Sequence, residues 1–385
     1  QGGFQGPGLS DINGCDGNLA GSDIAQVVSR LDNAVDLVVS GHTHAAYNCS
    51  ANTVDVTNSG TTITPRNAGL PNIIGRLVPV TSASAFGRVL TDIDVTIDPR
   101  SRDITAVAPT NRLVDRTNPA VQPSAEVAAI MNGYNALVSP IAGRVIGAIT
   151  TDLPNSATDA ACNMPAGDLI ADAQLAATAP ADFGGAQIAF MNRGGVRSPG
   201  FTYASSGTEG NGNVTYGEAF TAQPFGNSLV TMTLTAQDLK NVLEQQFAGC
   251  RGQGAATTRL MLPSAGFRYT WDGALACDAR IRNVTLTTNG QVETVVDAAG
   301  AVLNPTRTYR VTVNNFMATG GDGYTAFLNG TNPLGGAQDI DALVAYLAAY
   351  NAPSAPYNPA DAALGKPRIN RVGGTSCPGG ANVNP

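Results

Sequence analysis

One polar, proline-dotted stretch, between Asn111 and Ser124, interrupts the hydrophobic patterns of the chain. Pro119 and Pro123 disfavour a helix interior or a central strand at these positions. At 385 residues the chain also exceeds the roughly 250–300 residues at which one hydrophobic core stops growing. A hydrophobic content of 43% is sufficient for a sizeable core. We therefore expect two domains that are joined through this stretch.

The charge balance limits the partners of the chain. The formal net charge is −7, and charged residues make up only 13% of the sequence. A nucleic-acid binder needs clustered Lys and Arg to neutralise phosphates, so the composition argues against a nucleic-acid partner. The two histidines, His42 and His44, exclude any mechanism that would need three or more from this chain alone. No apolar run reaches about 18 residues, so we expect no membrane span.

The six cysteines lie on segments rich in Gly and Asn, and none forms a Cys-x-x-Cys pair. An even number without zinc-site spacing is typical of disulfides formed in an oxidising compartment. Cys15–Cys49 and Cys250–Cys277 would each close a compact loop, which leaves Cys162–Cys377 by elimination. Six free thiols in a cytosolic protein are the alternative, since connectivity cannot be read from sequence. Low charge with abundant Thr, Asn, Ser and Gly favours a secreted, cell-surface or periplasmic protein.

The first domain is expected to contain a helix, a short buried strand and further β structure. Its pattern predicts a helix over 24–31 capped by Ser22 or Asp23, a strand over 36–40, and strands from 72 to about 107 in which Ile93, Val95 and Ile97 form a half-buried face. A helix with Val127, Ile130, Met131 and Tyr134 on one face follows the polar stretch, and we interpret it as the connector.

The second domain mixes helices and strands without a regular βαβ rhythm, which favours an α+β fold. The predicted elements are a helix around 169–177, a strand ending at Asn192, a strand over 229–234, a helix capped by Thr235, a strand over 309–313 and a helix over 340–347. The segment after Val372 is rich in Gly and Pro, and we expect Cys377 to tie it down.

A Gly-His-Thr-His motif at residues 41–44 follows the apolar strand over 36–40. Residues two apart in an extended segment point to the same side, so both imidazoles can approach one metal ion. A generic His-x-His is more often structural. An apolar strand followed by Gly-His-x-His, however, resembles the last metal-ligand motif of the calcineurin-like metallophosphoesterases. The resemblance implies two divalent ions, such as zinc or manganese, in the intact protein, with His42 and His44 among their ligands.

Three blocks in the second domain resemble the 5'-nucleotidase C-terminal domain and occur in the order of that family. They are Asn-Arg-Gly-Gly-Val-Arg at 192–197, Tyr-Gly-Glu-Ala-Phe and Gln-Pro-Phe-Gly-Asn within 216–227, and Asn-Phe-Met-Ala-Thr-Gly-Gly-Asp-Gly-Tyr at 315–324. Residues 168–173 also resemble the opening helix of the family. The chain as a whole resembles a bacterial 5'-nucleotidase that is incomplete at its N-terminus, with part of a metallophosphoesterase domain ahead of the C-terminal domain.

The resemblance implies a nucleoside site of six residues. Phe225 and Phe316 would stack on the base, Asp322 would accept from the ribose diol, Arg197 would donate to a ribose or phosphate oxygen, and Asn192 and Asn227 would offer amide contacts. Each aromatic contact with a base is worth roughly 1–3 kcal/mol, and a carboxylate suits a ribose diol. The alternative interpretation is structural, with the two phenylalanines in the core and the aspartate as a turn former.

Most metal-ligand motifs of the family are absent from this sequence. Residues 1–5 resemble the segment that follows the family's lone metal-ligand histidine. We therefore expect the upstream half of the catalytic domain to lie before Gln1. Leu37, Val38 and Val39 would then lie on an open sheet edge, which a missing N-terminal segment or another chain would cover.

These inferences combine into one expected organisation. Residues 1–115 are the C-terminal half of an α/β metallophosphoesterase-type sandwich, 116–140 a connector helix, 141–370 an α+β 5'-nucleotidase C-terminal domain that binds the nucleotide, and 371–385 a tail. The intact protein is expected to hydrolyse nucleotide phosphate esters by a two-metal mechanism. The 385-residue chain alone is predicted to be inactive. The alternative is a non-catalytic extracellular protein that binds nucleosides or self-assembles.

Overall fold

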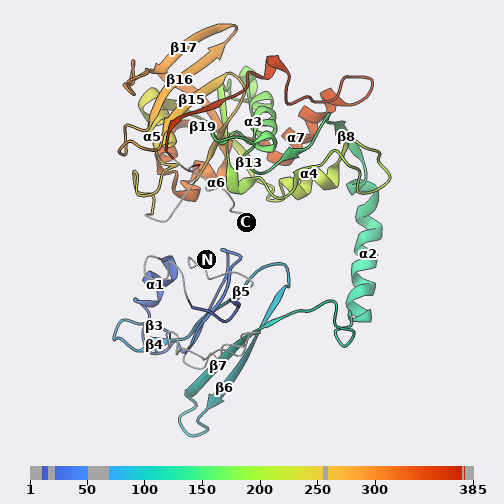
Figure 1. Ribbon diagram of the computed structural model, residues 1–385, viewed down its shortest axis with the longest axis vertical. Coiled ribbons are helices and arrows are strands. Elements are labelled where there is room, and N and C mark those ends of the chain that lie inside the picture. The colour runs from blue at the N-terminus through green and yellow to red at the C-terminus, as the bar shows by residue number, and fades with distance from the viewer. Residues whose placement is uncertain (1–10, 16–21, 51–68, 255–258, 375–376, 378–385) are drawn as a thin grey trace. The chain divides into compact units, whose positions relative to one another are not determined.

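The computed structural model describes residues 11–15, 22–50, 69–254, 259–374 and 377 (Figure 1). The motif at 1–5 and most of the predicted tail lie outside these residues. The chain forms two compact units, Gln1–Ala129 and Ile130–Pro385, each of which is described by itself.

Unit 1 is built on a three-stranded sheet with one helix. The helix α1 (Asp23–Val28) begins where the Ser22 side chain accepts from the Ala25 amide, as its cap residue predicts. The sheet has the order β1-β5-β2, with β1 (Val38–Ser40) parallel and β2 (Ala46–Cys49) antiparallel to β5 (Val80–Ala83). Its small core contains the Cys15–Cys49 disulfide together with Ile24, Val28, Tyr47, Leu70, Val78 and Val80.

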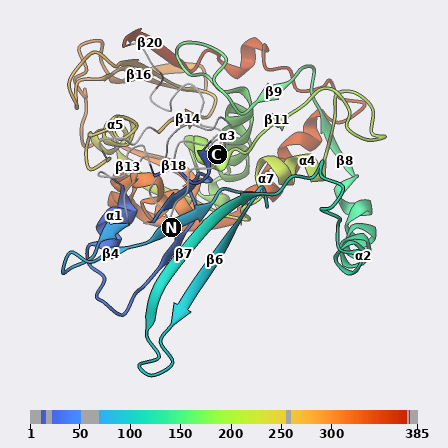
Figure 2. The same cartoon turned by 60° about the horizontal axis from the view of Figure 1, so that its bottom comes forward.

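Within the described residues, β1 lies at one end of this sheet, and its Val39 side chain is 62% exposed. The pair β3 (Leu70–Pro71) and β4 (Leu77–Val78) is antiparallel, as is the long hairpin of β6 (Val89–Ile97) and β7 (Ile104–Leu113), seen side by side in Figure 2. The prediction that one face of β6 is half-buried is wrong beyond Ile93, because Val95 and Ile97 are exposed. Alternation predicts a strand, but burial requires a partner layer that packs on that face.

The connector helix α2 (Ala125–Ala142) spans the boundary between the two units. None of its residues is buried, although Val127, Ile130, Met131 and Tyr134 recur at helical spacing as expected. No helix in the described part of the chain is both long and apolar enough to cross a membrane.

Unit 2 is centred on a five-stranded mixed sheet. Its order is β14-β10-β18-β13-β19, in which only β10 and β18 pair in parallel. The bounds are β10 (Ile188–Asn192), β13 (Ser228–Thr235), β14 (Met261–Pro263), β18 (Thr308–Asn314) and β19 (Thr331–Gln338). The helix α3 (Pro165–Thr178) packs on β10 and against α7 (Asp339–Leu347), and α5 (Ala236–Glu244) packs near β13 (Figure 1). Two short helices, α4 (Tyr216–Ala222) and α6 (Asn315–Ala318), complete the helical part.

A second sheet of order β17-β16-β15-β20 shares one continuous core with the first. Its strands are β15 (Phe267–Asp272), β16 (Ile281–Thr288), β17 (Gln291–Val296) and β20 (Ile369–Gly373). Two antiparallel pairs are shorter: β8 (Val145–Ala148) with β12 (Asn213–Thr215), and β9 (Leu153–Pro154) with β11 (Gly200–Phe201). The mixed sheets and their helices agree with a fold that combines both kinds of element, whereas the metallophosphoesterase sandwich stays a prediction.

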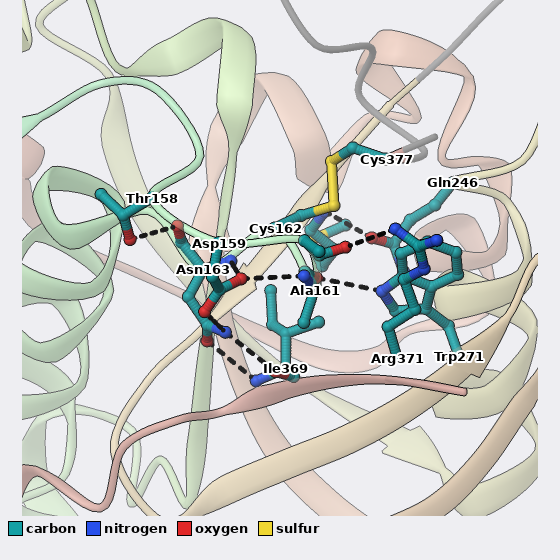
Figure 3. Close-up of a disulfide and its surroundings, with 12 residues drawn as sticks. Thr158, Asp159, Ala161, Cys162, Asn163, Gln246, Trp271, Ile369, Arg371 and Cys377 are labelled. Carbon is teal, nitrogen blue, oxygen red and sulfur yellow. Dashed lines mark hydrogen bonds between the residues drawn. A yellow bond between two sulfur atoms is a disulfide. The ribbon is translucent and has the colours of Figure 1, made fainter. Parts of the chain in front are cut away.

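Ion pairs join the end of unit 2 to α3, and a disulfide joins it to the turn before α3. Buried Arg368 lies 2.6 Å from Asp172 and 3.9 Å from Asp168, and Lys366 lies 3.0 Å from Asp168. The Cys162–Cys377 disulfide links Cys377 to the hydrogen-bonded Asp159–Asn163 turn, whose Ala161 carbonyl accepts from Trp271 Nε1 (Figure 3). With Cys250–Cys277, the structure has the three disulfides that the sequence favours, and none of the six cysteines is free.

Candidate nucleoside site

Two neighbouring parallel strands place polar residues at one edge of the main sheet. β10 ends at Asn192 and β18 ends at Asn314, and both side chains are buried. Because β10 and β18 run in parallel, their carboxyl ends meet at the same edge, where sites on such sheets tend to lie. The Asn314 amide nitrogen donates to Asn192 Oδ1 at 3.1 Å. The motifs that follow these two strands are therefore brought together.

Asp322 is held at this edge by several donors. Asn192 Nδ2 donates to its Oδ2 at 2.7 Å. Its main-chain carbonyl accepts from Gln253 Nε2 at 2.9 Å and from Arg259 Nε at 3.1 Å. The same Arg259 nitrogen lies 3.5 Å from Asp322 Oδ1. Asp322 has a φ of +57°, a conformation that Asp tolerates better than most residues. The carboxylate is thus oriented by the fold rather than left as a mobile turn residue.

Phe316 lies on α6, whose first turn is capped by Asn314. Asn314 Oδ1 accepts from the Met317 amide at 2.8 Å. The Phe316 ring is 45% exposed. It packs over Gly321, where a Cβ atom would lie 2.6 Å from the ring. Only glycine leaves room for the ring in this position.

Phe225 follows α4, which begins with a capping box between Thr215 and Glu218. Its ring is 47% exposed, and the Arg197 guanidinium carbon lies 4.8 Å from the ring centroid. Burial lowers the pKa of the Arg197 guanidinium, and the Asp322 carboxylate acts in the opposite direction. Arg197 therefore links the face of Phe225 to the charge of Asp322.

The six residues predicted to contact the ligand differ in whether their polar groups already have protein partners. Both groups of the Asn192 amide already have protein partners, on Asn314 and Asp322. Asn227 Nδ2 donates to Asp339 Oδ2 at 3.2 Å, and its carbonyl accepts from the Asp339 amide at 2.8 Å. Burial raises the pKa of Asp339. Phe225, Phe316, Arg197 and Asp322 keep the geometry for ligand contact, whereas the two asparagines act on protein groups.

The histidine pair lies in unit 1, directly after β1. The backbone there is not extended as the sequence argument assumed, because His42 and His44 have φ of +76° and +58°. His44 packs edge-on against Phe86, with 5.4 Å between ring centroids. Its Nδ1 is buried and has no hydrogen-bond partner among the described residues, which suits a metal ligand.

A complete dinuclear centre does not form around these two histidines. Within the described residues, the one cluster with metal-ligand character is elsewhere, at Glu244, Cys250, Cys277 and Asp278. Its two sulfurs are joined in a disulfide, so they offer no thiolate. Two imidazoles are too few for two divalent ions, which usually need carboxylates as well. The described residues thus supply a pair of ligands and not a whole site.

The roles of three residues at this site could not be predicted from the sequence. Asn314 precedes a recognised motif, but its role depends on Asn192, 122 positions away. Gln253 and Arg259 lie in a stretch without any motif signal and reach Asp322 across 69 and 63 positions. No local pattern reports such contacts.

Unit 2 is similar to a known domain. Residues 145–329 match the family model described as the 5'-nucleotidase C-terminal domain. The chain is 28% identical over 312 residues to a snake venom 5'-nucleotidase of Macrovipera lebetinus, covering 78% of this chain and 69% of that protein. It is 27% identical over 341 residues to the endonuclease YhcR of Bacillus subtilis, covering 88% of this chain but 23% of YhcR. These matches support the predicted resemblance to the 5'-nucleotidases, a family of hydrolases.

The fold is also that of a solved 5'-nucleotidase precursor from Thermus thermophilus. The TM-score is 0.53 at 24% identity, over 91% of this chain and 62% of that one. The chain therefore spans only part of these longer relatives. The family model of the C-terminal domain matches residues 145–329 of this chain.

Proposed function

We propose that unit 2 binds a nucleotide or nucleoside, and that the intact protein hydrolyses nucleotide phosphate esters. The base lies between Phe225 and Phe316, and the ribose diol donates to the Asp322 carboxylate. Arg197 donates to a ribose or phosphate oxygen. The 5'-nucleotidases among the relatives support this assignment.

One observation carries the proposal: two half-exposed phenylalanines are each linked to the surroundings of the oriented Asp322 carboxylate, Phe316 by packing over Gly321 and Phe225 by contact with Arg197. Phe190, Phe267 and Phe327 are buried, as structural phenylalanines are. Phe225 and Phe316 instead leave ring surface open beside Arg197 and Gly321. An open ring face next to a hydrogen-bond acceptor suits a purine nucleoside, which combines an apolar base with a polar sugar.

We further propose that His42 and His44 are ligands of divalent ions in the intact protein. The unpartnered Nδ1 of His44 supports this assignment. The remaining ligands would come from an upstream segment or another chain at the edge of β1. For the 385-residue chain alone, we expect negligible phosphate release from AMP with added Mn²⁺ or Zn²⁺.

The proposed location is extracellular or at the cell surface. Three disulfides fit an oxidising compartment, and one relative is a venom protein. The prediction that nucleic acid is not a partner rests on the charge balance, and YhcR is named an endonuclease. Cleavage of single- or double-stranded DNA by this chain would contradict that prediction.

Calorimetry with adenosine tests the binding proposal. We expect the chain to bind adenosine, and Phe225→Ala and Phe316→Ala each to weaken binding about tenfold, since one stacked ring contributes roughly 1–3 kcal/mol. Phe183→Ala removes an exposed phenylalanine outside the site and serves as the control. The proposal fails if adenosine does not bind, or if all three variants bind it as well as the wild type does. Lack of adenosine binding would favour the alternative of a self-assembling surface protein.

A further inference from the structure

Asn314 joins the two parts of the site that would hold the base and the ribose. It is the last residue of β18 and the N-cap of α6, and it is buried. Its Oδ1 accepts from the Met317 amide at 2.8 Å, which fixes the first turn of the helix that carries Phe316. Its Nδ2 donates to Asn192 Oδ1 at 3.1 Å. Asn192 Nδ2 in turn donates to Asp322 Oδ2 at 2.7 Å.

The groups at the two ends fix which atom of each amide donates and which accepts. We call this series of hydrogen bonds, from the Met317 amide through Asn314 and Asn192 to Asp322, the relay. At one end stands a backbone N–H, which only donates, so it must face the oxygen of the Asn314 amide. At the other end stands a carboxylate, which only accepts, so the nitrogen of the Asn192 amide must face Asp322. The nitrogen of Asn314 then meets the oxygen of Asn192. Reversing either amide would place two acceptors together, which costs the buried hydrogen bond.

The hydrogen bonds that Gln253 and Arg259 donate to Asp322 go to its main-chain carbonyl, and Arg259 also forms a longer ion pair with the carboxylate. The hydrogen bond from Asn192 is the shortest contact to its carboxylate among the described residues, at 2.7 Å against 3.5 Å for Arg259. A shift of Asn314 therefore reaches Phe316 through the helix cap and Asp322 through Asn192.

We propose that Asn314 is a positioning residue. It fixes the ring of Phe316 and the carboxylate of Asp322 relative to each other, so that both can contact one nucleoside. This inference rests on the proposed function, because it assigns to Asn314 the spacing between the base and ribose contacts. Asn314 touches neither part of the ligand itself. Its two amide groups serve different contacts, so they can be separated by substitution.

Two variants separate the helix cap that Asn314 Oδ1 provides from the hydrogen bond that its Nδ2 donates to Asn192. Asn314→Asp keeps an oxygen that caps α6, since Asp is a good N-cap, but it removes the donor to Asn192. Asn314→Ala removes both groups. Asn315→Asp adds the same charge at the next, exposed position and is the matched control. The ligands are adenosine and 2',3'-dideoxyadenosine, which lacks the diol that Asp322 would accept from.

Calorimetry should give different patterns for the two variants. Asn314→Asp is expected to weaken adenosine binding about tenfold, a typical loss for a hydrogen bond to a charged group, while dideoxyadenosine binding changes less than about twofold. Asn314→Ala is expected to weaken both ligands. The inference is overturned if Asn314→Asp weakens both ligands equally, if it weakens neither, or if Asn315→Asp has the same effect.

A ligand-free measurement keeps this inference separate from the proposed function. In Asn314→Asp the Asn192 amide must turn its oxygen toward Asp322, where it meets a carboxylate. Asp322→Asn supplies a donor at that place, so the double variant restores the relay in the opposite direction. Urea unfolding should therefore show that the double variant loses less stability than the sum of the single losses. Additive losses contradict the relay, whereas rescue without adenosine binding in the wild type would reject only the nucleoside function.

Discussion

At the scale of single residues, the position of Phe316 depends on a close contact that only glycine at position 321 allows. Phe316 can lie over the turn at Gly321 because that position has no Cβ. The motif that contains both residues is visible in the sequence, but the steric reason for the glycine is not. Asn314, Gln253 and Arg259 act over more than 60 positions, and their roles follow from strand order and not from a local pattern.

Gly321→Ala is expected to displace the Phe316 ring. The added Cβ would lie 2.6 Å from the ring, and overpacking of this kind costs about 1–3 kcal/mol in the free energy of unfolding. Adenosine binding should weaken as well, because the stacking face moves. Gly335→Ala is the control, since nothing lies within 4 Å of the Cβ that it would add. Urea unfolding and calorimetry check both effects, and equal stability and affinity for the two variants would contradict this account of Phe316.

At the scale of elements, periodicity and caps predict most of unit 2. Thr235 begins α5 as expected, and its side chain and that of Asp238 form a capping box. β10, β13, β18 and α7 lie where their patterns place them. Burial is less predictable, as the exposed Val95 and Ile97 on β6 show. Alternation records which residues share a face, but the layer that covers the face comes from distant parts of the chain.

The ion pairs between α3 and the segment just before β20 give a prediction at this scale. Burial raises the pKa of Asp172, and the adjacent Arg368 lowers it. Arg368→Met leaves Asp172 and Asp168 without this cation, which should cost about 3–5 kcal/mol in the free energy of unfolding at neutral pH. The loss should shrink as the pH falls through the raised pKa of Asp172, because protonation removes the uncompensated charge.

Urea unfolding between pH 4 and 8 measures this dependence. Arg371→Met is the control in the adjoining strand β20, because Arg371 donates to main-chain carbonyls and lies over Trp271, with no acidic partner in the described residues. Its cost should not change with pH. A pH-independent loss for Arg368→Met would mean that lost packing, and not the buried carboxylates, explains the effect.

At the scale of the whole molecule, the chain is two units that differ in the size of their described cores. Unit 2 has a continuous core, two disulfides and a match to a known domain. The described part of unit 1 has a small core, a sheet edge at β1 and two histidines. The sequence supports the family of the C-terminal domain through motifs. The hydrolytic centre stays a proposal, because its ligands would have to come from several segments that meet only in a complete fold.

A crystal structure of the chain with adenosine tests the central claim most directly. We expect density for the base between the rings of Phe225 and Phe316, with a ribose hydroxyl within hydrogen-bond distance of Asp322. Adenosine bound elsewhere, or rings of Phe225 and Phe316 that pack against protein while the ligand is absent at saturating concentration, would contradict it.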